Sequence, residues 1–116
     1  MARDVRAYLH DAHTAACLIV EFIGATSLAD YSSNAMLKSA IERQFEILGE
    51  AFNQMAKLDP ALAQTIPDLR RIVDFRNVLA HAYAVVDDAL VWNAATRNVP
   101  VLRQCLRDKL VELGDA

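Results

Sequence analysis

The chain has 116 residues, of which 54% are hydrophobic, with only three glycines and three prolines. This composition predicts a single folded domain over residues 1–116 and excludes disordered and fibrous classes. The net charge of −3 excludes a protein whose whole surface binds nucleic acid, so any contact with nucleic acid has to be local. No apolar run approaches the roughly 20 residues needed to cross a membrane, and we expect a cytoplasmic protein without a membrane partner.

The N-terminal part predicts one long helix followed by a polar connection. Over residues 4–25, apolar side chains recur at steps of three and four, which is typical of an amphipathic helix. Residues 26–33 are polar, and Asp30, Ser32 or Ser33 could each cap the helix that follows. No stretch of the sequence has the alternating pattern of a strand, so we expect an all-α fold.

The second predicted helix, residues 34–57, is apolar over a wide arc. Its main stripe is Leu37, Ile41, Phe45 or Gln44, Leu48, Phe52 and Met55, and a second set is Ala40, Ile47, Ala51 and Leu58. One interpretation is that such a helix buries one face in its own bundle and the other against a second copy of the chain; the alternative is a central helix covered only by its own bundle. Gly49 costs such a helix roughly 1 kcal/mol relative to alanine, and it predicts that another backbone passes close by.

Glu42, Glu46 and Glu50 follow one another at steps of four and form an acidic ridge on the same helix. The functional interpretation is that one of them orients Arg76 or His81 from across the bundle. The alternative is a solvated face beside basic residues of the same helix, which we favour for at least two of the three carboxylates.

Residues 60–66 predict one short helical turn before the third long helix. Pro67 is expected at the first position of that helix, where its missing N–H donor is harmless. Arg70, Arg71 and Arg76 are expected to face outward as one dense cationic patch in an acidic chain, with Arg71 as a candidate substrate contact. The predicted core residues of this helix are Leu69, Ile72, Val73, Val78 and Leu79.

The C-terminal part predicts a helix capped at Asp87 and Asp88, and a last segment that Pro100 either starts or kinks. Trp92 is interpreted as a core anchor and not as a platform for stacking bases. Cys105, together with Cys17 of the first helix, is interpreted as a reduced core residue; the alternative is a disulfide pair in an oxidising compartment. The apolar residues of these two segments are Leu90, Val91, Trp92 and Ala95, and Val101, Leu102, Cys105, Leu106 and Leu110.

The densest group of reactive side chains lies in the stretch Arg76-Asn77-Val78-Leu79-Ala80-His81-Ala82-Tyr83. An arginine can grip a phosphate with a planar fork of donors, and a histidine can move a proton near neutral pH. On a straight helix, residues five apart are rotated by about 140°, so Arg76 and His81 would not stack. They can face one ligand if the helix ends or distorts near Ala80, or if a second copy of the chain contributes.

Metal sites are not indicated by the remaining histidines and carboxylates. His10 and His13 lie one helical turn apart, as two ligands of one metal would, but no third ligand follows at helical spacing. We interpret both as solvent-exposed residues. The second helix also lacks the Glu-x-x-His pattern of a di-metal bundle site. We therefore expect no metal site and no cofactor.

The segment Arg76-x-x-x-x-His81-x-Tyr83, with Asn77 directly after the arginine, resembles the signature of the HepT-like branch of the HEPN domains. Residues 41–51, Ile-Glu-Arg-Gln-Phe-Glu-Ile-Leu-Gly-Glu-Ala, resemble the second-helix block of the same branch. The tail, including residues 86–87, 91–92 and 99–102, is similar in order and spacing. Together these blocks cover about residues 1–112. One departure is that Asp68-Leu69 replaces a tryptophan often found just before the third helix.

The resemblance implies an up-and-down bundle of four to five helices that forms a homodimer and brings two Arg-His motifs into one cleft. It implies a metal-independent endoribonuclease that acts on RNA as the toxin of a toxin–antitoxin pair. The implied partner is a small nucleotidyltransferase of the MNT type, which silences the toxin by transferring AMP onto a tyrosine. Carried over by position, Arg76 and His81 are catalytic, Asn77 is supporting, and Tyr83 is the site of AMPylation.

Two other functions remain open besides the enzyme, which is our main prediction. In the first, Arg76 and His81 form polar contacts within a non-catalytic helical dimer that serves as the binding partner of a nucleotidyltransferase. The acidic pI favours this interpretation, whereas the intact motif favours the enzyme. In the second, the chain is a structural bundle in which His81 stabilises a helix C-terminus through the helix dipole.

Overall fold

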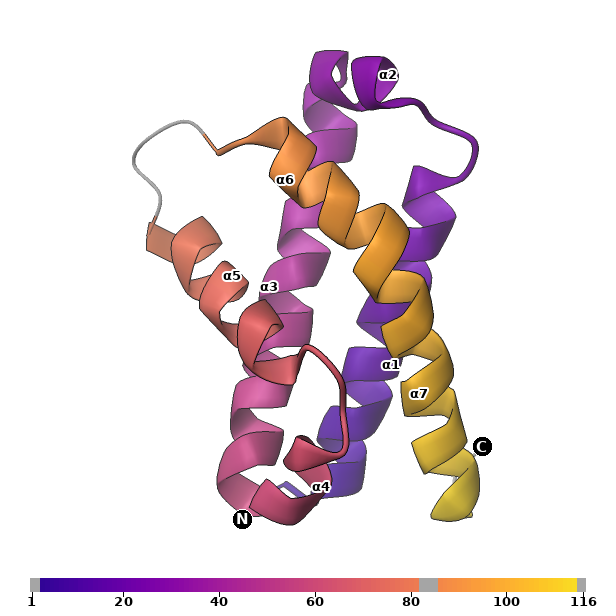
Figure 1. Ribbon diagram of the computed structural model, residues 1–116, viewed down its shortest axis with the longest axis vertical. Coiled ribbons are helices and arrows are strands. Elements are labelled where there is room, and N and C mark those ends of the chain that lie inside the picture. The colour runs from indigo at the N-terminus through magenta and orange to yellow at the C-terminus, as the bar shows by residue number, and fades with distance from the viewer. Residues whose placement is uncertain (1–2, 82–85, 115–116) are drawn as a thin grey trace.

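The computed structural model describes residues 3–81 and 86–114, and every regular element in this part of the chain is helical (Figure 1). In chain order these elements are α1 (Val5–Ile23), α2 (Leu28–Ser33), α3 (Ala35–Leu58), α4 (Pro60–Gln64), α5 (Leu69–His81), α6 (Asp88–Asn93), a π-helical turn (Ala94–Asn98) and α7 (Val99–Glu112). The predicted all-α class is therefore confirmed. No described helix is both long and apolar enough to span a membrane.

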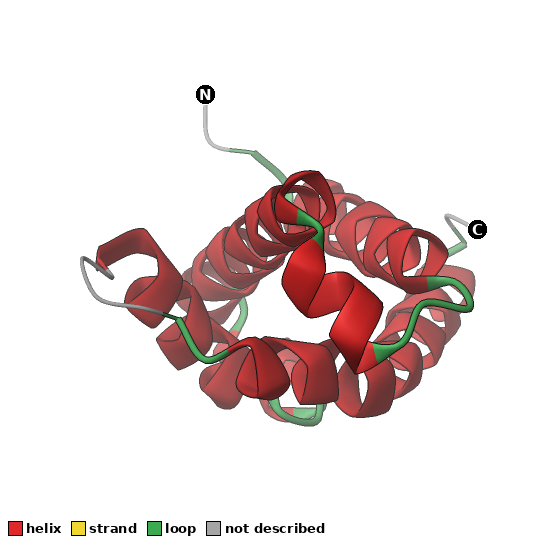
Figure 2. Cartoon of the chain, turned by 90° about the horizontal axis from the view of Figure 1, so that it is seen from above, coloured by secondary structure: helices red, strands yellow, loops and turns green. Residues whose placement is uncertain are grey.

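The central element of the bundle is α3. Its 24 residues make it about 36 Å long at a rise of 1.5 Å per residue, and the longest dimension of the molecule is 40 Å. Helices α1 and α5 both pack against α3, and α7 packs against α1. Seen along the long axis, the helices surround one apolar core (Figure 2). The largest fully buried side chains include Leu9, Ile19, Tyr31, Ile41, Phe45, Leu48, Phe52, Met55, Leu102 and Leu106.

A short helix, α2, interrupts the connection that was predicted at residues 26–33. Ser27 caps it by accepting the backbone N–H of Asp30 at 3.1 Å. Tyr31 of this helix is fully buried, and its ring lies 5.8 Å from that of Trp92. Contact with a helix far along the chain therefore holds α2 in place, and it supports the interpretation of Trp92 as a packing residue.

Asn34 caps the long helix α3, since its side chain accepts the backbone N–H of Leu37 at 3.0 Å. The prediction that Asp30, Ser32 or Ser33 provides this cap is wrong. Those three residues already belong to α2, and a capping residue has to lie just outside the helix that it caps.

Helix α5 begins at Leu69, two residues later than predicted, so Pro67 is not at its first position. Asp68 has a positive φ of 61°, a conformation that interrupts a right-handed helix. Its carboxylate accepts a hydrogen bond from Asn98 Nδ2 at 2.9 Å, which connects this turn to the π-helical turn before α7. Leu69, Ile72 and Val73 are buried as predicted.

Three residues that were predicted to lie in the core are exposed. Val78 is 56% exposed, Leu90 is 55% exposed and Val101 is 59% exposed. Helices α5 and α6 make few direct contacts, which leaves a surface hollow between them. Val78 of α5 and Leu90 of α6 line this hollow. An apolar residue on the correct helical face remains exposed where no neighbouring helix covers it.

Helix α6, which Asp87 caps, is joined through the π-helical turn to α7, so the three form one continuous helical rod. Asp87 accepts the N–H of Ala89 at 2.9 Å, as predicted for a cap. The π turn follows, in which Val99 donates its N–H to the Ala94 carbonyl, and α7 begins without a break. A proline lacks an N–H and crowds the carbonyl four residues before it, so a widened turn before Pro100 relieves the crowding.

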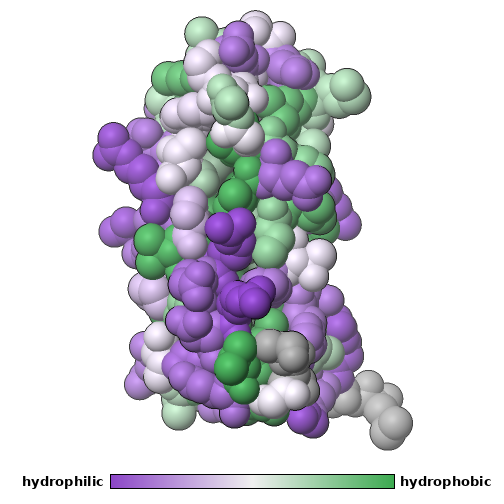
Figure 3. Space-filling view, turned by 90° about the vertical axis from the view of Figure 1, so that its right-hand side faces the viewer, coloured by the Kyte–Doolittle hydropathy of each residue, from purple (hydrophilic) through white to green (hydrophobic). Residues whose placement is uncertain are grey.

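The side of the molecule opposite α5 has a mixed surface. Figure 3 shows this face, on the side of α7, with apolar and hydrophilic side chains interspersed. Cys17 and Cys105 are free thiols, as predicted, but both are half-buried and not core residues. Helix α5, which contains the candidate functional residues, lies on the other side of the bundle (Figure 1).

Candidate active site on helix α5

Gly49 allows α5 to lie directly against α3. A Cβ atom at this position would stand 2.8 Å from Cγ of Arg76 and 3.2 Å from the carbonyl oxygen of Ile72, and it would overlap Cβ of Arg76. Atoms in packed interiors do not approach so closely. The predicted close approach of another backbone at Gly49 is therefore confirmed, and that backbone is α5 of the same chain.

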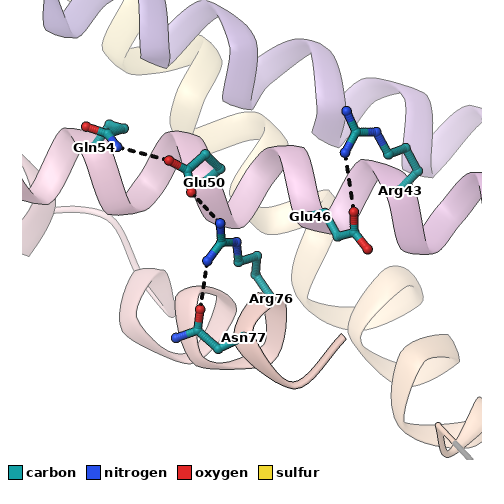
Figure 4. A network of polar contacts seen from close by, with 6 residues as sticks. All are labelled: Arg43, Glu46, Glu50, Gln54, Arg76 and Asn77. Carbon is teal, nitrogen blue, oxygen red and sulfur yellow. Dashed lines mark hydrogen bonds and ion pairs between the residues drawn. The ribbon is translucent and has the colours of Figure 1, made fainter. Parts of the chain in front are cut away.

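Arg76 turns inward, towards α3 (Figure 4). Its Nη2 donates to Oε2 of Glu50 at 2.7 Å, and its Nη1 donates to Oδ1 of Asn77 at 2.9 Å. Gln54 Nε2 donates to the other carboxylate oxygen of Glu50 at 2.9 Å. The side chain of Arg76 is only 29% exposed. These contacts hold the guanidinium in one orientation, while a guanidinium has five N–H donors in all and so can also bind a phosphate.

The three glutamates of the acidic ridge have different surroundings. Glu50 holds Arg76 across the bundle, whereas Glu46 pairs with Arg43 of its own helix at 3.3 Å. Glu42 is half-buried, and burial raises the pKa of its carboxyl group. The expectation that one glutamate orients Arg76 or His81 is therefore confirmed for Glu50, which the sequence alone did not single out.

His81 is the last residue of α5, and it is exposed. Because α5 stays helical up to His81, the rotation of about 140° between residues five apart still separates its side chain from that of Arg76. One copy of the chain thus presents an inward arginine and an exposed histidine. Tyr83, the predicted site of AMPylation, lies outside the described residues.

The predicted cationic patch is divided in the structure. The Arg71 side chain is 76% exposed, and its Nη1 lies 3.9 Å from Oδ1 of Asp68. Arg71 lines two surface hollows, and Arg76 lines neither of them. Arg70 lines one of the same hollows. The prediction that Arg76 faces outward with them is wrong, because the Glu50 carboxylate holds it against α3.

A surface hollow of about 270 Å³ lies beside Arg76, between α1, α3 and α5. Three of its lining residues are arginines, and each is paired with a lining carboxylate. These pairs are Arg3 with Asp11 at 2.8 Å, Arg43 with Glu46 at 3.3 Å, and Arg76 with Glu50 at 2.7 Å. The other described residues that line the hollow are Tyr8, Ile47, Ala51 and Ala80. Sequence reasoning did not find this group, because its members come from three separate segments that only the packed bundle brings together.

The two histidines of α1 differ in exposure. His10 is exposed, as predicted, but His13 is half-buried, and its Nε2 lies 3.6 Å from Sγ of Cys17. Burial, followed by the charge of Arg107, lowers the pKa of His13, because α7 packs over this part of α1. Among the residues that the structure describes, no group of three or more His, Cys, Asp and Glu side chains is placed to hold a metal ion.

Comparison with known proteins finds a matching family and relatives that cover most of the chain. The family model "Ribonuclease HepT-like" matches residues 12–108, which include Arg76 and His81. The "Probable ribonuclease HepT" of Thermococcus cleftensis is 31% identical over 103 residues, which are 89% of this chain and 93% of that protein. The "Putative RNase MJ1380" of Methanocaldococcus jannaschii is 29% identical over 104 residues, or 88% of this chain and 93% of that protein. No solved structure matches the chain.

Proposed function

Since the chain belongs to the ribonuclease HepT-like family, we propose that it is an endoribonuclease that cleaves RNA at its Arg76–His81 motif. The observation that carries the proposal is the placement of the motif on α5. Arg76 is held in one orientation by Glu50 and Asn77, and His81 is exposed at the end of the same helix. A fixed cation and an accessible proton carrier are the two groups that RNA cleavage needs if no metal takes part.

The proposed reaction uses the nucleophile that RNA itself carries. The 2′-hydroxyl attacks the adjacent phosphorus, a 2′,3′-cyclic phosphate forms, and the 5′-oxygen leaves. One group has to take the proton of the 2′-hydroxyl and another has to give a proton to the 5′-oxygen; His81 fills one of these roles, and a water molecule fills the other. Arg76 stabilises the negative charge that grows on the phosphate oxygens, and Asn77 keeps the guanidinium in place.

The proposal therefore includes a homodimer. The rotation of about 140° between Arg76 and His81 prevents one copy from aiming both side chains at the same phosphate. A two-fold related copy can supply the missing side chain, because in such a dimer the same surface is presented twice. The arginine of one copy would then act with the histidine of the other.

We further propose that the chain is a cytoplasmic toxin, silenced by a small nucleotidyltransferase antitoxin of the MNT type. That partner would join the Tyr83 hydroxyl oxygen to the α-phosphorus of ATP and release pyrophosphate. Support comes from the sequence, in which Tyr83 follows His81 by two residues. A bulky, negatively charged AMP so close to the histidine would repel RNA and block its access.

Non-catalytic binding of a nucleotidyltransferase is a second candidate function, and the contacts of Arg76 favour it. A guanidinium that bonds to Glu50 and Asn77 ties α5 to α3, which is a structural role that needs no chemistry. In that case the motif would shape the helical dimer that the partner recognises, and the chain would cleave no RNA.

The decisive test is RNA cleavage by the purified wild-type chain and the His81→Ala variant, with a chelator present. His81 is exposed, so its loss should leave the fold and the dimer intact while cleavage falls by about 10²-fold or more. His10→Ala, which removes an exposed histidine from α1, is the matched control and should cleave like the wild type. Products with 2′,3′-cyclic phosphate ends are expected.

Three results would contradict parts of this proposal. Products that end in a 3′-hydroxyl would exclude the 2′-hydroxyl as nucleophile, and loss of cleavage in the chelator would exclude metal independence. A pure wild-type dimer that leaves single-stranded RNA intact, yet binds a nucleotidyltransferase encoded beside it, would establish the second candidate function instead.

A further inference from the structure

The hollow beside Arg76 adjoins the proposed active site. Its lining includes Arg76 itself and reaches Ala80, the residue before His81. Its volume of about 270 Å³ is close to the lower end of the roughly 300–1,000 Å³ that is typical of small-molecule sites. It therefore has the size for one nucleotide and not for a folded element of RNA.

The lining combines the two kinds of surface that bind single-stranded RNA. Tyr8, Ile47 and Ala51 provide an aromatic ring and apolar atoms, and Arg3 lies over the Tyr8 ring with its guanidinium carbon 4.6 Å from the ring centroid. Unstacked bases bind to aromatic rings and to guanidinium planes. Arg43 and Arg76 line the same hollow, and a guanidinium group is a good donor to phosphate oxygens.

The arginines of the hollow differ in how firmly their carboxylates hold them. The Arg76–Glu50 pair is short, at 2.7 Å, and the arginine is 29% exposed. The Arg43–Glu46 pair is longer, at 3.3 Å, and the Arg43 side chain is 67% exposed. Exposed ion pairs contribute little to stability, so Arg43 can exchange its carboxylate for a phosphate at small cost, whereas Arg76 stays in place.

Among the described residues that line the hollow, three arginines face three carboxylates, so their charges balance. A phosphate is therefore not attracted by an excess of positive charge, and it has to replace a carboxylate on an arginine. It follows that the two members of the Arg43–Glu46 pair should have opposite effects on RNA binding, because Glu46 competes with the phosphate for Arg43.

We propose that this hollow is the subsite for the nucleotide next to the cleaved bond, with Tyr8 contacting its base and Arg43 binding its phosphate in exchange for Glu46. The proposal rests on the proposed ribonuclease function, and it assigns substrate contacts outside the Arg76–His81 motif. Arg43 is a binding residue in this arrangement, while Arg76 remains the group next to the reacting phosphate.

The test measures the affinity of the full chain for a short, fluorescently labelled single-stranded RNA at several salt concentrations. Every protein carries His81→Ala so that the RNA stays intact. Arg43→Gln is expected to weaken binding by about fivefold or more and to reduce the slope of log affinity against log salt by about 0.7, the value for one lost phosphate contact on a single strand. Glu46→Gln is expected to tighten binding by at least about twofold.

Matched variants separate a local effect from a change in net charge. Arg103→Gln and Glu21→Gln remove the same charges from exposed positions on α7 and α1 that do not line the hollow, and both should bind RNA almost like the parent. Ala80→Leu adds apolar volume at an exposed position of the hollow without changing charge, and it should weaken binding. Thermal unfolding of each variant checks that the bundle is intact.

The outcomes distinguish failure of the subsite from failure of the proposed function. If the wild-type chain cleaves RNA but Arg43→Gln binds like Arg103→Gln, the subsite is wrong and the ribonuclease proposal stands. Glu46→Gln that binds no better than Glu21→Gln would also overturn the subsite. If the wild-type chain neither binds nor cleaves single-stranded RNA, both proposals fail together.

Discussion

Replacing Gly49 with alanine tests whether the close approach of α5 to α3 positions the candidate site. The new methyl group would overlap Cβ of Arg76 and would stand 3.2 Å from the carbonyl oxygen of Ile72. Both neighbours belong to or lie next to the α5 backbone, so no flexible side-chain end can move aside. Relief requires α5 to shift away from α3, which would pull Arg76 from Glu50.

The size of the effect follows from two opposing contributions. Alanine in place of glycine in a helix interior stabilises that helix by about 1 kcal/mol. Adding a methyl group to a close-packed contact costs roughly 1–3 kcal/mol, and the backbone contact at Gly49 places this case at the upper end. We therefore expect a net loss of about 1–2 kcal/mol, which corresponds to a fall in Tm of roughly 4–10 °C for a domain of this size.

The assay combines thermal unfolding with RNA cleavage measured well below Tm. Gly49→Ala should lower Tm and should reduce cleavage further than the fraction of unfolded protein explains, because the guanidinium no longer lies beside Glu50. Ser39→Ala is the matched control: it raises the helix propensity of α3 at an exposed position, and it should keep Tm and activity. A Gly49→Ala protein as stable as the wild type would refute the argument from close approach.

Three further predictions concern stability, each measured by thermal unfolding. Asn34→Ala should cost about 0.5–2 kcal/mol through loss of the α3 cap, whereas Ser32→Ala should have little effect; equal effects would contradict the assignment of the cap. Within the described part of the chain the buried Tyr31 hydroxyl has no hydrogen-bond partner, so Tyr31→Phe should leave Tm unchanged or raise it, and a clear fall would reveal a partner. Burial, and then Asp88 and Glu46, raise the pKa of the Glu42 carboxyl against the opposing effect of Lys38. An acid whose pKa is raised in the folded state ionises there at a cost, so Glu42→Gln should stabilise the protein at neutral pH. This gain should disappear as the pH falls below the ordinary glutamate pKa of about 4.3, where the carboxyl group is protonated in both the folded and the unfolded state. A gain that persists at pH 3 would contradict this cause.

The sequence predicted those parts of the fold that depend on local periodicity. Steps of three and four placed α1 and α3 to within a few residues, and Asp87 was recognised as a cap. Two of the wrong predictions, the polar connection at residues 26–33 and the start of the third long helix at Pro67, have a different cause, which is contact between distant segments. Packing of Tyr31 against Trp92 accompanies the unexpected helix α2, and the bond from Asn98 to Asp68 accompanies the turn that delays α5. Neither pair is visible in a local pattern.

The candidate site was predictable in part for the same reason. The motif on α5 is contiguous, so its residues could be found directly, and Gly49 indicated where a second backbone had to approach. Which carboxylate holds Arg76 depends on the register between α3 and α5. Glu42, Glu46 and Glu50 are four residues apart and share one face of α3, so their spacing alone does not identify the partner. The inward turn of Arg76 follows only once Glu50 is known to be the partner.

The geometry of α5 leads to a last prediction, about which copy of the chain supplies which group. If the arginine of one copy acts with the histidine of the other, a mixed dimer of Arg76→Ala and His81→Ala chains contains one intact pair and one pair that lacks both groups. Random mixing gives mixed dimers as about half of the population, so about a quarter of the wild-type sites should return although each parent is inactive. If each copy used its own pair, every site in the mixture would lack one group. The two chains are unfolded together and refolded, with each parent treated alone as the control, and cleavage is compared at equal dimer concentration. Recovered cleavage would establish a site that is shared between the two copies. A mixture no more active than its parents would refute the shared site. In that case α5 would have to distort so that Arg76 and His81 of one chain meet.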